Sequence, residues 1–473
     1  MAEIRVKEMP ESADTYPKGV HVLKVSVRFC CVCAMAVSLW AQDSTGGSSS
    51  TASSPYEGAG FSGRSPVRIG LAGAESVPIT ISLSVGGSYD SLLGAFRTDS
   101  QGNLAPGAGS YGVEGGFFLS GQKKLRRSVF GISYFANYSY FLNTVGFNGT
   151  NQSLNLAYSR RVTKRTELTL TTIGNITNRV IGNPLNRQTG GLELIAAPVN
   201  ELFDTRLYFL QSNAAVSYVL NNRWQFQFGG NGGIVRRQAR ALADVNLYGG
   251  TGGATYRVNR RSTIGFSVTY SHFNFGKQFG ESDIYGASVN YTRQFGRGWT
   301  SSAHVTIFDV RTIGVRRVAL DPVIAALLGT NEGSEAFQIA SKTPGFGANV
   351  EKRFRRNTIS FGADRGVQPG NGLFLTSLVT SYFAGTTYQL NNKWSLTASA
   401  NQATMSSLGA DTLGAFSSEA VMVQISRLIT REIGFFSSAE YRQFTIAGST
   451  LNRQGTRVTI GLNYQPTSLP FGK

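Results

Sequence analysis

Apolar and polar residues alternate along several segments of ten or eleven residues between Val77 and Gln465. In the last segment, residues 458, 460, 462 and 464 are apolar or aromatic, while Thr459, Gly461 and Asn463 lie between them. The same alternation occurs at 130–140, 224–228 and 264–270. A period of two predicts β-strands with one apolar face and one polar face. The apolar segments are too short for a membrane-spanning helix.

Short polar turns separate these segments. In Tyr218–Phe228 (YVLNNRWQFQF) and Tyr388–Thr397 (YQLNNKWSLT), two asparagines stand between two strand-like runs. Asparagine tolerates positive φ, so we expect two-residue hairpin turns at both places. Six related short turns are predicted at 123–127, 160–165, 259–261, 296–298, 353–357 and 428–431.

The spacing of the turns matches the thickness of a membrane. The turns lie about 38 residues apart, with two intervals near 59, which is room for two strands and two connections. A tilted strand of ten or eleven residues covers roughly 25 Å, the height of an outer-membrane apolar band. With a strand at each end, at about Ile79–Tyr89 and Gln454–Gln465, the count is eighteen, within a range of sixteen to eighteen. Solenoid and propeller repeats have similar periods but do not predict alternating short and long connections.

Aromatic residues occupy fixed positions beside these turns. Tryptophans begin three strands and tyrosines precede five turns, at Trp224, Trp299, Trp394, Tyr158, Tyr218, Tyr256, Tyr291 and Tyr388. Aromatic rings favour the boundary between lipid and water, so we expect these residues at the membrane interface. The alternative is the core of a soluble β-sandwich, which gives no reason for one position relative to the turns.

In this pattern the chain resembles bacterial outer-membrane β-barrels of the porin type, over about 390 residues. The resemblance implies an all-β fold, a transmembrane antiparallel up-and-down β-barrel with short periplasmic turns and long extracellular loops. It also implies that the protein lies in the outer membrane of a Gram-negative bacterium. Its expected partners there are outer-membrane lipid, lipopolysaccharide and the outer-membrane assembly machinery. The oligomeric state, monomer or trimer, stays open.

The amino-terminal residues predict export and a tether. Residues 1–41 contain a basic flank, an apolar run from Phe29 to Leu39 and a small residue at Ala41, as a signal peptide does; translation is expected to start near Val20. Residues 42–66 are rich in Ser and Gly and are expected to be a flexible periplasmic tether. The barrel is assigned to residues 67–473.

Basic residues gather at the short turns of a chain with formal net charge +18. They are Lys123, Lys124, Arg126, Arg127, Arg160, Arg161, Lys164, Arg165, Arg260, Arg261, Arg353, Arg355 and Arg356. One interpretation is a solvated collar that meets anionic lipid headgroups. The other is a positive periplasmic mouth that favours anionic solutes. A ring at a membrane rim does not suit nucleic acid, which we exclude as a partner.

Candidate pore-lining residues follow from strand parity. His304, Glu351, Glu440 and Arg442 fall on lumen-facing positions, where charges set selectivity or form salt bridges that brace the wall. His272 shares the parity of Phe266 and is expected to face outward. The sequence contains no nucleophile with a histidine partner on one face, no metal-ligand spacing and no phosphate-binding loop. We therefore expect no enzyme, no metal site and no cofactor.

Two longer loops are predicted, at about Thr177–Arg206 and Asp309–Thr343. In the second, Asp321-Pro322 followed by VIAALLG predicts a capped helix that constricts the mouth or, alternatively, binds a protein. The function expected from the whole pattern is a passive channel for small hydrophilic solutes, with a preference for anions. The alternative is a structural, adhesive, exopolysaccharide-associated or secretion-associated barrel with a blocked lumen.

Overall fold

The computed structural model describes residues 77–91, 97–98, 104–105, 109–142, 148–177, 206–238, 243–276, 280–296, 298–319, 332–369, 375–408, 415–446 and 452–466. The signal peptide, the tether and the helix predicted after Asp321 lie outside these residues. None of the described residues belongs to a helix long and apolar enough to cross a membrane.

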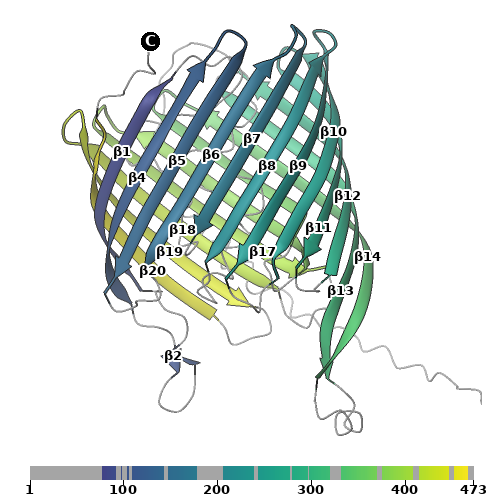
Figure 1. Ribbon diagram of the computed structural model, residues 1–473. Coiled ribbons are helices and arrows are strands. Elements are labelled where there is room, and N and C mark those ends of the chain that lie inside the picture. Colours follow the sequence, from purple (N-terminus) through teal and green to yellow (C-terminus); the bar gives the residue numbers. More distant parts are fainter. Residues whose placement is uncertain are drawn as a thin grey trace, which may run out of the picture. The chain divides into compact units, whose positions relative to one another are not determined.

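Eighteen strands form one closed antiparallel sheet (Figure 1). They are β1 (Val77–Asp90), β4 (Ser110–Lys124), β5 (Ser128–Phe141), β6 (Gly149–Arg161), β7 (Thr166–Thr177), β8 (Leu207–Val219), β9 (Trp224–Arg237), β10 (Val245–Asn259), β11 (Ser262–Phe275), β12 (Gly280–Phe295), β13 (Trp299–Ala319), β14 (Glu332–Arg353), β15 (Asn357–Pro369), β16 (Thr376–Gln389), β17 (Trp394–Ser407), β18 (Phe416–Leu428), β19 (Ile433–Ile446) and β20 (Asn452–Tyr464). Two short strands, β2 (Arg97–Thr98) and β3 (Leu104–Ala105), pair with each other between β1 and β4.

Pairing between the first and last strands closes the sheet. Residues 83–90 of β1 pair with residues 457–464 of β20, while the other edge of β1 pairs with β4. All eight predicted short turns connect neighbouring strands, and β20 ends at the same end of the barrel where β1 begins. The predicted all-β fold, a transmembrane antiparallel up-and-down β-barrel of eighteen strands, is confirmed.

The outer face carries the apolar residues of each strand. Large apolar side chains such as Val85, Phe228, Val268 and Ile307 are 56% to 64% exposed on the protein surface. Residues of opposite parity are small, polar and largely buried on the concave inner side, for example Ser153, Asn155 and Thr306. Water would not favour such an outer face, whereas lipid would.

The asparagine turns differ in detail from the prediction. Four residues, 220–223, separate β8 from β9, so the connection is not a two-residue hairpin turn. Asn221 acts through its side chain, because its Oδ1 accepts hydrogen bonds from the backbone N–H groups of Arg223 (2.8 Å) and Trp224 (2.9 Å). Asn391 repeats the arrangement with Lys393 and Trp394. The preference for asparagine thus comes from its carbonyl group.

The turn between β12 and β13 requires a glycine. Gly298 has φ +78°, and a Cβ at this residue would lie 2.6 Å from the carbonyl oxygen of Arg353 on β14. The backbone carbonyl of Gly298 accepts a hydrogen bond from the N–H of Arg353 at 3.0 Å. Only glycine combines this backbone conformation with such a close approach.

The predicted loop at Asp309–Thr343 is wrong for most of its length. β13 continues to Ala319 and β14 begins at Glu332, and the two strands pair throughout as one long hairpin. Pairing of β14 with β15 stops at Phe346 and Arg365. Figure 1 shows this hairpin extending past the ends of the neighbouring strands. The other predicted loop begins after Thr177, where β7 ends, and β8 starts at Leu207.

Candidate pore and membrane-facing sites

Small hydroxyl side chains line much of the inner face. Pairs on adjacent strands hydrogen-bond to each other, as do Ser267 with Ser288 (2.6 Å) and Ser395 with Ser426 (3.0 Å). Thr312 on β13 also contacts Thr376 at the start of β16, with 3.1 Å between their Oγ1 atoms. An inner wall of this composition is hydrophilic and offers hydrogen bonds to water and to polar solutes.

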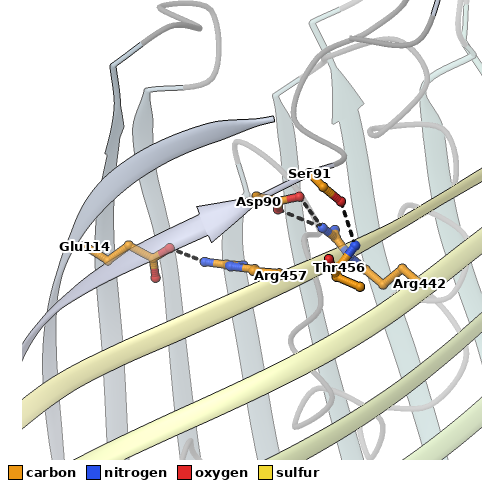
Figure 2. A network of polar contacts seen from close by, with 6 residues as sticks. All are labelled: Asp90, Ser91, Glu114, Arg442, Thr456 and Arg457. Atoms are coloured by element: carbon orange, nitrogen blue, oxygen red, sulfur yellow. Dashed lines mark hydrogen bonds and ion pairs between the residues drawn. The ribbon is translucent and has the colours of Figure 1, made fainter. Parts of the chain in front are cut away.

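Arg442 lies in a buried ion pair on the inner wall. Its Nη2 donates to both carboxylate oxygens of Asp90, at 2.9 and 2.7 Å. The side chains of Arg442 and Asp90 are 3% and 1% exposed. Figure 2 shows the guanidinium extending from β19 to the end of β1. This geometry favours the bracing role that the sequence left open for Arg442, because the charge is already paired.

A second pair completes the network. Arg457 on β20 forms an ion pair with Glu114 on β4 (Figure 2). Glu440, 7% exposed, stands opposite Arg457 in the register of β19 and β20. The backbone of Ser91 donates to the Thr456 carbonyl and its hydroxyl accepts from the Thr456 N–H, at 2.9 and 2.8 Å. Three carboxylates and two guanidinium groups thus meet where β1 and β20 close the barrel.

Each of these pairs spans an intervening strand. Arg442 crosses β20 at Gly455, its partner in register, and Glu114 faces Gly86 of β1 in the same way. A Cβ at Gly86 would lie 2.8 Å from the backbone carbonyl oxygen of Ile460, so β1 and β20 approach each other closely there. Asp90 and Glu114 were not among the candidate residues, since their partners lie 352 and 343 residues away in the sequence.

His304 also pairs across a strand. Its Nε2 lies 3.4 Å from Oδ2 of Asp364 on β15, and the two side chains are 40% and 48% exposed. Gly347 of β14 stands between them in register and faces both side chains. Glu351 pairs with Arg353 on the same strand. These inner-face charges are far more accessible than Asp90 and Arg442.

An apolar cluster lies at the end of the barrel opposite the short turns. Its buried members are Ile173, Leu207, Phe209, Val235, Ala243, Val245, Leu247, Phe273, Phe275, Ile284 and Val310. Phe308, Val367, Leu375 and Leu408 pack against it. The cluster joins residues of β7 to β13 with residues next to β16 and β17. Sequence reasoning missed it, although Phe273 and Phe275 have the parity opposite to that of outward Phe266.

Arg237 enters this apolar cluster from β9. The side chain is 6% exposed, and its Nη1 donates to the carbonyl of Ala243. Within the described part of the chain, its Nε and Nη2 have no hydrogen-bond partner. Arg237 is therefore a buried polar group with unsatisfied donors inside an apolar cluster.

The predicted interface aromatics lie at the short-turn end of their strands, where several have cationic partners. Lys352 stands over the ring of Trp299 at 4.9 Å, and Arg427 stands over Trp394 at 5.1 Å. Trp224 instead packs against Tyr256, with ring centroids 4.8 Å apart. Partners of this kind hold an aromatic ring and a cation together at the level of lipid headgroups.

The basic turn residues divide between the two faces of the barrel. By strand parity, Lys123, Arg160 and Lys352 lie on the outer face with the aromatic rings. Their neighbours Lys124, Arg161 and Arg353 lie on the inner face. The predicted collar therefore presents positive charge both to the membrane surface and to the inner mouth of the barrel. Arg126, Arg127, Lys164, Arg165, Arg260, Arg261, Arg355 and Arg356 lie in the turns between them.

His272 lies on the outer face of β11. Its Nδ1 is 2.9 Å from Oδ1 of Asp283, which also accepts a hydrogen bond from the hydroxyl of Tyr270 at 2.8 Å. Tyr248 stacks on the imidazole at 4.6 Å. Ser271, next to His272 in the sequence, has the opposite parity and lies on the inner face.

Comparisons with known proteins give only distant likenesses. No protein-family model and no curated protein matches the chain. Among solved structures, OccK2 (OpdF) of Pseudomonas aeruginosa in complex with glucuronate has a TM-score of 0.41 at 11% identity, over 83% of this chain and 100% of that chain. OpdK of the same species with vanillate has 0.39 at 11%, over 82% and 98%. The FrpB iron transporter of Neisseria meningitidis has 0.40 at 9%, over 82% and 81%.

Proposed function

We propose that the chain is an outer-membrane channel for passive diffusion of small hydrophilic solutes. The observation that carries the proposal is the closed eighteen-stranded barrel, apolar outside and lined by small hydroxyl and amide side chains inside. Barrels of sixteen to eighteen strands are wide enough for an aqueous lumen. The proposed partners are outer-membrane lipid, lipopolysaccharide and the assembly machinery, and no enzymatic activity is assigned.

Positive charge on the inner face supports a preference for anions. Lys124 and Arg161 stand at the inner mouth, where Arg353 is paired with Glu351, while two of the three carboxylates of the wall network form ion pairs with guanidinium groups. A ring of one sign of charge lowers the barrier for ions of the opposite sign.

The apolar cluster favours a second candidate function, a barrel with a blocked lumen that serves in adhesion or secretion. Apolar side chains of β7 to β13, with Val367, Leu375 and Leu408, gather on the inner face at the end opposite the short turns, and a hydrophobic constriction in a pore stops the passage of water and ions. The two candidates differ in one measurable property, the current that the folded protein carries across a membrane.

Conductance of the full chain in a planar bilayer tests the proposal. A channel gives discrete current steps whose size rises with salt concentration. Silence under every applied voltage, with folded protein present in the bilayer, would favour the blocked barrel.

The reversal potential in a KCl gradient tests the preference for anions. Neutralising the inner residues together (K124Q, R161Q, R353Q) should move the reversal potential toward that of a nonselective pore. Neutralising the outer residues beside them (K123Q, R160Q, K352Q) is the matched control and should change it little. An equal effect of both sets would contradict an origin of selectivity at the inner mouth.

A further inference from the structure

A groove opens on the short-turn end of the barrel between two turns. It has a volume of ≈ 780 Å³ and is lined by Lys164 and Arg165 of the β6–β7 turn, residues 219–223 of the β8–β9 turn, Trp224 and Tyr256. Strand parity puts both rings on the outer, lipid-facing side, together with Phe226 and Phe228. The groove therefore adjoins the apolar band of the barrel.

Three cations converge on this groove. Lys164, Arg165 and Arg223 contribute to its lining, which contains no carboxylate. None of the three forms an ion pair with another residue in the described segments. Elsewhere on the chain, Arg442 and Arg457 are paired with carboxylates. The positive charge of the groove is thus left for a ligand.

Local contacts hold the groove in shape. Arg223 donates from Nη1 to the hydroxyl of Tyr256 at 3.4 Å, and the Trp224 ring lies 4.8 Å from that of Tyr256. The side chain of Asn221 fixes the backbone of Arg223 and Trp224. The N–H of Val219 bonds to the carbonyl of Arg165 at 2.8 Å and so joins the two turns. Hydrogen bonds and ring packing therefore hold the two turns that carry the cations in a fixed arrangement.

The depth of the groove in the membrane indicates which class of ligand it binds. Trp224 occupies the same place after a short turn as Trp299 and Trp394, and such aromatic residues mark the boundary between hydrocarbon and headgroups. A ligand here has acyl chains on the apolar band and a negative group among the cations. We propose that the groove binds the phosphate headgroup of an anionic phospholipid of the periplasmic leaflet. Arg223 is the central contact, and Trp224 and Tyr256 cover the glycerol region.

Quenching of Trp224 by brominated lipid tests this site directly. The full chain with Trp224 as its only tryptophan (W40F, W299F, W394F) is folded into phosphatidylcholine vesicles. Dibrominated phosphatidylglycerol or dibrominated phosphatidylcholine is added at equal mole fraction. Each basic residue near an anionic surface raises the binding constant about fivefold. Phosphatidylglycerol should therefore be preferred over phosphatidylcholine at Trp224 by at least about fivefold. Equal quenching by the two lipids overturns the proposal and leaves the groove to a soluble acidic partner.

Charge variants separate the site from general attraction to the membrane. K164Q/R165Q/R223Q should abolish the preference at Trp224, whereas K393Q, at the equivalent position before Trp394, should preserve it. A preference that survives the triple variant, or that falls equally with K393Q, overturns the proposal. Folding of each variant is checked by heat-modifiable electrophoretic mobility.

Salt provides a test that needs no charge variant. At 1 M KCl, where the screening length is about 3 Å, the preference of the single-tryptophan protein for phosphatidylglycerol should decrease severalfold. A preference unchanged by salt overturns the assignment to the three cations. Because none of these measurements uses conductance, a failed channel proposal and a failed lipid site give different results.

Discussion

Arg442 of β19 binds Asp90 of β1 across the intervening strand β20, with Nη2 2.7 and 2.9 Å from the two carboxylate oxygens. The contact therefore bypasses the hydrogen-bonded seam between β1 and β20. Glu114 and Arg457 cross the same seam from the other side, over β1. Two ion pairs thus reinforce the one junction of the barrel that joins residues from opposite ends of the chain.

Removing one member of the buried pair should destabilise the barrel. Asp90→Asn removes the carboxylate that accepts two hydrogen bonds from Arg442 in a buried ion pair, and breaking such a pair costs about 3–5 kcal/mol. The free energy of unfolding, from denaturant titration of protein folded in vesicles, measures the loss. The double variant D90N/R442M should be less destabilised than the two single changes added together. Asp309→Asn, in an exposed pair with Arg311, is the control and should cost no more than about 1 kcal/mol.

Gly347→Ala should lower the unfolding free energy by about 1 kcal/mol, because its methyl group would displace the ends of the His304 and Asp364 side chains, which are 40% and 48% exposed and can move aside. Gly115→Ala is the matched control, since an added Cβ there has nothing within 4 Å. This second change should alter stability by no more than about 0.5 kcal/mol. Equal effects of the two alanine substitutions would mean that the contact of His304 and Asp364 over Gly347 does not contribute to stability.

Asn221→Ala should lower the unfolding free energy by about 1–2 kcal/mol, because two backbone N–H groups lose their acceptor. Asn222 is its neighbour in the same turn, and its side chain makes no hydrogen bond within the described residues. Asn222→Ala should therefore be nearly neutral. A larger loss for Asn222 than for Asn221 would show that backbone conformation, rather than the side-chain carbonyl, selects asparagine here.

Polar replacement in the apolar cluster should raise conductance. Phe209 and Phe273 are 6% and 5% exposed on the inner side, and the variant F209S/F273S should widen and wet the constriction, with roughly twofold larger current steps. The control is F228S/F266S, which changes two phenylalanines on the outer face. If single-channel conductance is the same in both variants, the cluster does not limit the current.

Most of the fold could be predicted because its signals are local. Alternation along a strand and a turn such as Asn221-Asn222 depend on neighbouring residues only, so the eight short turns and the eighteen strands follow from the sequence. The β13–β14 hairpin could not be recognised in this way. Asp309 and Arg311 have outward parity, and a polar outer face does not match a strand in lipid. Outside the membrane the outer face of a strand need not be apolar, and the two strands can remain paired there.

The candidate site could be predicted only in part, because it depends on register. Parity placed His304, Glu440 and Arg442 on the inner face. It did not reveal that Asp90 pairs with Arg442, since this contact exists only after β1 meets β20. The apolar cluster combines residues from many strands, and no single strand contains its pattern. The groove beside Trp224 likewise needs two turns that the sequence separates by some fifty residues.

The long β13–β14 hairpin extends past the ends of the neighbouring strands (Figure 1). Residues 332–345 of β14 continue past the last pair with β15, and at about 3.3 Å per residue they form a ribbon roughly 45 Å long. In the orientation of the proposed channel, with the short turns toward the periplasm, this ribbon stands outside the cell. Substitutions along it are therefore expected to change what the cell surface presents and to leave the inner face of the barrel untouched.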